Sequence, residues 1–93
     1  MKLQITYSKE ADKFLKKNAH LISEDATDKL VISAVKSILK IQNTNIDLKK
    51  LKGEFKGCFR IRKSDVRIIF SLQKEKLMSV FIHDIDFRGN IYK

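Results

Sequence analysis

Three short runs rich in Val, Ile and Phe fill most of the second half of the chain, at residues 59–62, 66–72 and 77–85. Polar connections at 63–65 and 73–76 separate these runs, and such lengths are typical of β-hairpins. The pattern predicts three consecutive strands, each paired with the next, in an antiparallel meander.

The first half has a different period. Residues 3–7 alternate apolar and polar side chains, which predicts a half-buried strand. Ser8 is a candidate N-cap for a helix that ends near His20, and acidic residues follow it in the first turn. Ser23 is a second candidate N-cap, before a wide apolar stripe at helical spacing that ends at 43–45. We therefore expect two antiparallel helices joined by a short turn.

The order of these elements predicts an α+β fold. An N-terminal strand, two antiparallel helices and a three-stranded antiparallel meander place both helices on one face of the sheet and leave the other face open. Ninety-three residues suit one domain, 1–93, and with no proline and three glycines the chain has no linker composition.

Charge points to the class of partner. Twenty Lys and Arg residues against eleven Asp and Glu give a formal net charge of +9, which raises affinity for polyanions. Composition alone fits a solvated lysine-rich surface equally well. Position is more informative, because all four arginines, the residues that bind phosphate bidentately, fall in the second half: Arg60, Arg62, Arg67 and Arg88.

The apolar pattern selects a strand register that brings three of these arginines together. Arg60 and Arg62 share one strand face, with Ile61 on the other. Pairing Arg62 with Arg67 places Ile61 beside Ile68 on the helix side, whereas a slip by one residue would put Ile68 among the arginines. We expect no acidic neighbour on the arginine face, so that a polyanionic ligand supplies the counter-charge. A merely solvated face is the alternative.

Other chemistry is not indicated. Cys58, His20 and His83 are too far apart in sequence for a metal motif, and no glycine-rich nucleotide loop is present. Cys58 lies in an apolar strand pattern and is expected to pack rather than react. A single cysteine, no signal peptide and no apolar run long enough for a bilayer predict a cytoplasmic protein without metal or cofactor and away from the membrane.

The sequence resembles the RelE/ParE superfamily of bacterial toxin–antitoxin toxins over its whole length. The segments that carry the resemblance are Tyr7-Ser8-Lys9-Glu10-Ala11, Leu48-Lys49-Lys50-Leu51-Lys52-Gly53, Gly57-Cys58-Phe59-Arg60-Ile61-Arg62, Val66-Arg67-Ile68-Ile69-Phe70 and Ile85-Asp86-Phe87-Arg88-Gly89-Asn90-Ile91-Tyr92. The resemblance implies a toxin of a type II system. RelE-like members cleave mRNA on the ribosome through attack of a ribose 2′-OH on the adjacent phosphate.

Two other functions stay open. ParE-like members inhibit DNA gyrase without cutting nucleic acid, and a degenerate member would be only a basic binding module. Any active member implies a cognate antitoxin as partner, and the RelE-like branch implies the ribosome and mRNA as well.

Site residues follow from the same resemblance. The matching catalytic positions are Arg60, Arg62, Arg67, Arg88 and Tyr92. The first three would stabilise charge at the scissile phosphate, and Tyr92 would stack on a base or assist proton transfer. Further RNA contacts are expected from Lys52, Lys56 and His83.

The chain departs from the family pattern in two ways: it has no evident general base, and it has acidic residues near Arg88. Arginine stays protonated and is a poor general base, so the group that removes the 2′-OH proton is open. His83 is one candidate, although a lone strand histidine is more often structural. Asp84 and Asp86 near Arg88 could partly neutralise it.

Overall fold

The computed structural model describes residues 3–87. Its elements, in chain order, are β1 (Leu3–Tyr7), α1 (Lys9–Lys17), α2 (Glu24–Ile38), β2 (Asp47–Lys50), the 3-10 turn η1 (Gly53–Phe55), β3 (Cys58–Lys63), β4 (Val66–Lys74) and β5 (Met78–Phe87). The expected order of strand, two helices and meander is confirmed, with one additional strand, β2.

Both helices begin at the serines that the sequence singled out. The Ser8 hydroxyl accepts a hydrogen bond from the Ala11 amide at 3.1 Å, and the Ser23 hydroxyl accepts one from the Ala26 amide at 3.0 Å. Each cap satisfies an amide that has no partner inside its helix. The helices end earlier than expected, at Lys17 and at Ile38.

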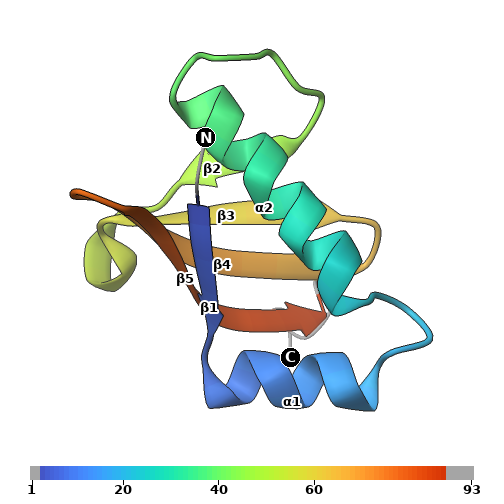
Figure 1. The fold of residues 1–93 in the computed structure, drawn as a ribbon. Coiled ribbons are helices and arrows are strands. Elements are labelled where there is room, and N and C mark those ends of the chain that lie inside the picture. Colours follow the sequence, from blue (N-terminus) through green and yellow to red (C-terminus); the bar gives the residue numbers. More distant parts are fainter. Residues whose placement is uncertain (1–2, 88–93) are drawn as a thin grey trace.

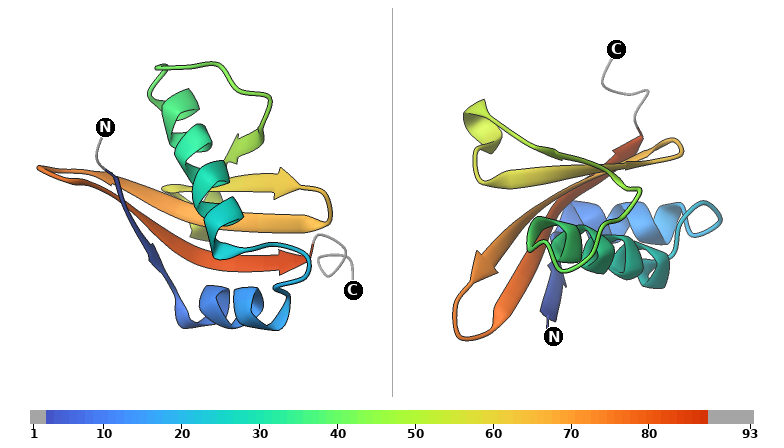
Figure 2. Two further views of the ribbon diagram at one scale, coloured as in Figure 1. Left: turned by 45° about the vertical axis from the view of Figure 1, so that its right-hand side comes forward. Right: turned by 90° about the horizontal axis from the view of Figure 1, so that it is seen from above.

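The five strands form one mixed sheet in the order β1-β5-β4-β3-β2. β2 to β5 are antiparallel neighbours, whereas β1 runs parallel to β5 at the edge. Figures 1 and 2 show α1 and α2 on the same side of this sheet, so no helix within residues 3–87 covers the opposite side, called the open face below. The two helices run in opposing directions, but α2 crosses the sheet at a steep angle rather than lying alongside α1 (Figure 1).

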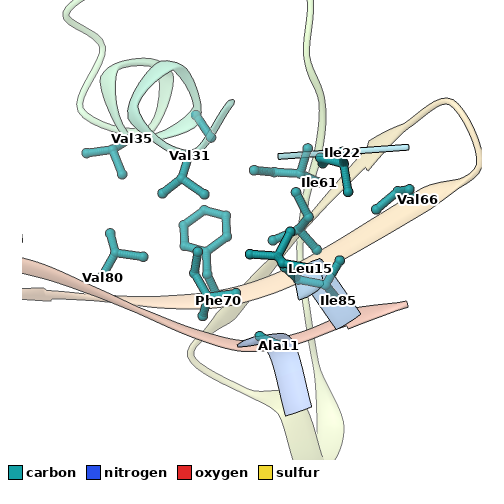
Figure 3. Close-up of a cluster of buried hydrophobic side chains, with 13 residues drawn as sticks. Ala11, Leu15, Ile22, Val31, Val35, Ile61, Val66, Phe70, Val80 and Ile85 are labelled. Carbon is teal, nitrogen blue, oxygen red and sulfur yellow. The ribbon is translucent and has the colours of Figure 1, made fainter. Parts of the chain in front are cut away.

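The core lies between the helices and the covered side of the sheet. Figure 3 shows Val31 and Val35 of α2 above Phe70 and Val80 of the sheet. All four side chains are at most 1% exposed. Burial of apolar area at this one interface is the main stabilising contribution to the fold.

β5 contains a β-bulge that decides which side chains reach the open face. Ile69 of β4 pairs with Asp84 and Phe70 pairs with Ile82, so His83 is an extra residue on β5. The bulge keeps both Ile82 and Ile85 in the core, where they are 0% and 2% exposed. Two residues three apart could not share one side of a regular strand, because side chains alternate.

The edge strand β1 is connected to α2 by a side-chain hydrogen bond. The Tyr7 hydroxyl donates to the Asp28 carboxylate and lies 3.4 Å from the Glu24 carbonyl oxygen. Burial, together with the hydrogen bond and charge of Asp28, raises the pKa of Tyr7 far above its ordinary value of 10.0. Tyr7 therefore stays neutral and donating throughout the physiological pH range.

Candidate functional site

Arg60, Arg62 and Arg67, together called the arginine cluster below, meet on the open face. β3 and β4 pair so that Arg62 stands directly opposite Arg67, which confirms the register expected from the apolar pattern. Ile61 and Ile68 form the neighbouring pair on the covered side, and both are 0% exposed. The demand for a continuous apolar side of the sheet therefore places three cations close together on the other.

The arginine cluster contains hydrogen-bond donors without acceptors. Within residues 3–87, the Nε atoms of Arg60, Arg62 and Arg67 are all buried and have no hydrogen-bond partner. A buried donor left unsatisfied costs about 1–3 kcal/mol, and more when the group is charged. A bound anion with several acceptor oxygens could satisfy such donors, and phosphate and carboxylate both suit the planar guanidinium.

The expectation that this face lacks acids is wrong. Asp47 of β2 accepts a hydrogen bond from Arg60 at 3.0 Å. Asp86 stands opposite Arg67 across β4 and β5, and Asp84 stands opposite Ile69. Each arginine of the cluster thus has a carboxylate on a neighbouring strand. Opposite charges on adjacent strands stabilise a sheet, so selection for folding alone would favour this arrangement.

Two features that the sequence analysis did not foresee explain this error. β2 was not expected as a strand, so Asp47 had no place on the sheet. The bulge at His83 was not expected either, and it turns Asp84 and Asp86 toward the arginines. The signals were present: Asp47 and Lys49 alternate with Leu48, and Ile82 and Ile85 are three apart rather than two.

The pKa of the Asp84 carboxylate is raised above its ordinary value. Burial, and then the charge of Asp86, raise its pKa, and the charge of Arg67 opposes them in part. A carboxylate with a raised pKa is a better proton acceptor than an ordinary one, and it lies on the same face as the arginine cluster.

His83 also reaches the open face. Its Nε2 lies 2.9 Å from the Ser71 hydroxyl, and its ring meets the Phe81 ring edge-on with 4.7 Å between centroids. The Ser8 hydroxyl donates to the His83 carbonyl oxygen at 2.7 Å, which fixes the bulge to the start of α1. The histidine is therefore held in place and exposed on the open face.

The other expected site residues are not part of this cluster. Lys52 and Lys56 are exposed in the connection between β2 and β3, on either side of η1 and near the Cys58 end of β3. Lys49, not expected earlier, stands opposite Arg60 on the open face. Cys58 is buried and unbonded, as expected of a packed residue. Arg88 and Tyr92 lie outside the described residues.

Two negative findings apply to residues 3–87. No three or more His, Cys, Asp or Glu side chains in this range are grouped so that they could hold a metal ion. In the same range, no helix has both the length and the apolar character needed to cross a membrane.

Comparison with solved structures identifies the fold. The metal-bound toxin from Helicobacter pylori superposes with a TM-score of 0.66 at 21% identity, over 98% of this chain and 99% of that one. The RelB-RelE antitoxin-toxin complex from Methanococcus jannaschii contains a match with a TM-score of 0.57 at 19% identity, over 94% of both chains. The chain has the RelE-like fold.

A third structure extends the likeness over the full length. A chain of the E. coli DinJ-YafQ toxin-antitoxin complex matches with a TM-score of 0.60 at 17% identity, and the match covers 100% of both chains. No protein-family model matches the sequence, and no curated protein sequence matches it significantly. The RelE-like fold therefore rests on three-dimensional shape, in agreement with the resemblance of the sequence segments.

Proposed function

We propose that this protein is the toxin of a type II toxin–antitoxin system and that it cleaves mRNA on the ribosome. The observation that supports this most strongly is the arginine cluster on the open face of a RelE-like fold, with three buried Nε donors that lack acceptors in the part of the chain that the structure describes. Full-length similarity to toxins, two of them crystallised with their antitoxins, supports the same proposal.

The reaction would be an attack of a ribose 2′-OH on the adjacent phosphorus. The 2′ oxygen loses its proton and forms a new bond to phosphorus, the bond to the 5′ oxygen breaks, and that oxygen takes up a proton. A cyclic phosphate and a free 5′-hydroxyl result. Charge builds up on the phosphate oxygens as the 2′ oxygen attacks. Arg62 and Arg67, directly opposite one another, would hold these oxygens and stabilise that charge.

The proton of the 2′-OH needs an acceptor, and arginine cannot be that acceptor because it stays charged. Two groups on the open face can accept it, His83 and Asp84. His83 is exposed and held by Ser71. Asp84 has a raised pKa and the charge of Arg67 nearby. Separate His83→Gln and Asp84→Asn variants would show which replacement lowers the rate of cleavage.

The test is to express the protein from a tightly controlled promoter and map the ends of cellular mRNA. We expect cuts in phase with the ribosome for the wild type and their loss in Arg67→Ala. Lys13→Ala is the matched control, since it removes one positive charge from an exposed position on α1 and should cut like the wild type.

Two other outcomes would contradict the proposal. Arrested growth with intact transcripts and a DNA-damage response would support the ParE-like inhibition of gyrase. Normal growth with intact transcripts would leave a basic binding module. The acids beside the arginine cluster, Asp47 and Asp86, are the observation that favours a protein that only binds, because they lower the charge available at a transition state.

The expected partner is an antitoxin. An acidic segment that covers the open face would compete with RNA for the arginine cluster and would stabilise the fold by linkage. A higher melting temperature in the presence of the cognate antitoxin is the corresponding expectation, and equal melting temperatures would contradict it.

A further inference from the structure

The open face has a second region, which begins beyond the arginine cluster on β4 and is lined by uncharged side chains. A hollow of about 230 Å³ lies there over β1, β5 and β4. The side chains that line it on the open face are Gln4, Thr6, Ser71, Gln73, Ser79 and Phe81. We call this region the polar hollow. A water takes about 30 Å³ of liquid volume, so the hollow has room for several waters or for one planar ring.

The sheet register builds the polar hollow from two rows of side chains. Ser79 of β5 stands between Gln4 of β1 and Gln73 of β4. Phe81 stands in the same way between Thr6 and Ser71. The alternation of side chains places both rows on the open face, and the parallel edge strand β1 supplies the outer wall.

The chemistry of the polar hollow suits an unpaired nucleobase. Phe81 is 39% exposed, which is unusual for a phenylalanine and leaves ring surface for stacking. His83 contacts the Phe81 ring edge-on and limits its movement. The amides of Gln4 and Gln73 carry donors and acceptors together, which is what the hydrogen-bonding edge of a base requires.

The polar hollow and the arginine cluster lie along the same strand. Arg67 and Gln73 are six residues apart on β4, which corresponds to about 20 Å at the usual rise per residue. One end of the open face offers charge for phosphates and the other offers an aromatic ring and uncharged hydrogen-bonding groups. A single-stranded RNA several nucleotides long would need both, because phosphates repeat along it and its bases are free to turn outward.

We infer that the polar hollow binds one unpaired base of the RNA whose phosphates the arginine cluster holds, with Phe81 as the stacking surface. This rests on the proposed function, since it assumes that RNA crosses the open face. Gln4, Gln73 and Ser79 would then determine which base is preferred. The base would thus be recognised in the polar hollow, whereas the backbone would be cleaved at the arginine cluster.

The test uses the purified protein and a short single-stranded RNA from which one base at a time is removed, with the sugar–phosphate backbone kept. For the wild type we expect one position whose base removal lowers affinity about fivefold or more, the usual effect of removing one stacked base. Phe81→Ala should bind the intact RNA with that lower affinity and should be insensitive to removal of the same base.

Three further variants make the result specific. Leu77→Ala removes another exposed apolar side chain, beside β5 but outside the polar hollow, and should behave like the wild type throughout the series. Arg62→Ala should weaken every RNA of the series by the same factor. Gln73→Ala should keep the sensitive position but change the preference among bases placed there. Melting curves check that each variant folds.

The outcomes separate this inference from the proposed function. Binding by the wild type with no sensitive position, or with one that persists in Phe81→Ala, overturns the inference and leaves the proposed function standing. Absence of any RNA binding by the wild type counts against both. If Phe81→Ala instead weakens only antitoxin binding, the polar hollow serves a protein partner and the inference is wrong.

Discussion

At the scale of single residues, the arginine cluster carries a cost to folding that the proposed binding of phosphate would offset. Arg62 and Arg67 are like charges directly opposite one another, and their Nε donors are buried without acceptors among the described residues, 3–87. Arg60 differs, because its guanidinium donates to Asp47 at 3.0 Å and its side chain is only 11% exposed. Arg60 and Arg62 lie two residues apart on β3 and therefore affect the free energy of unfolding differently.

Replacement of Arg62 by methionine should separate stability from binding. Methionine keeps much of the apolar stem and removes the repulsion, so Arg62→Met should raise the free energy of unfolding by about 0.5 kcal/mol. Urea unfolding measures this, and RNA affinity should fall at the same time. Arg60→Met is the matched control, which should give no gain because it removes the partner of Asp47. A lower free energy of unfolding in Arg62→Met would contradict this account of the cluster.

The raised pKa of Asp84 predicts a pH dependence of stability. A carboxyl whose pKa is higher in the folded state stabilises that state only while it is protonated, and this contribution disappears as pH rises through the folded pKa. Asp84→Asn should therefore be more stable than the wild type at neutral pH, by about 0.5 kcal/mol or less since the group is only partly buried. The difference should vanish below the ordinary pKa of 3.8, and thermal melts across this pH range would show it.

At the scale of elements, the sequence predicted what depends on periodicity and capping. Both N-caps, both helices and the Arg62–Arg67 register followed from local pattern. β2 did not, because Asp47–Lys50 is only four residues long with a single half-buried side chain, and it is a strand by virtue of its pairing with β3. The bulge at His83 depends on β4 as well as on β5, so no single run of sequence specifies it.

The Tyr7 hydrogen bond should contribute to the attachment of the edge strand. Tyr7→Phe removes the donor to Asp28 and should lower the free energy of unfolding by about 1 kcal/mol at neutral pH. Because the pKa of Tyr7 is raised on folding, its contribution is present below pH 10.0 and disappears at higher pH. Chemical unfolding of both proteins should therefore converge above that pH, and a constant difference would contradict this explanation.

At the scale of the whole molecule, the two sides of one sheet carry different side chains. The covered side supplies the apolar interface with α1 and α2, as Figure 3 shows. The open face carries the arginine cluster at one end and the polar hollow at the other, with His83 and Asp84 on it as well. The formal charge of +9 would attract a polyanion from a distance, and the open face would determine how it is held.

The salt dependence of binding to a single-stranded RNA tests the central claim most directly. The affinity for RNA decreases as salt concentration rises, and a plot of log affinity against log salt has a negative slope. The magnitude of that slope decreases by about 0.7 for each phosphate of a single strand that the protein no longer neutralises. We predict that Arg62→Ala reduces the steepness of this slope by about this amount and that Lys13→Ala, at an exposed position on α1 rather than on the sheet, leaves it unchanged. Equal slopes for the wild type and both variants would contradict the claim that the arginine cluster holds RNA phosphates.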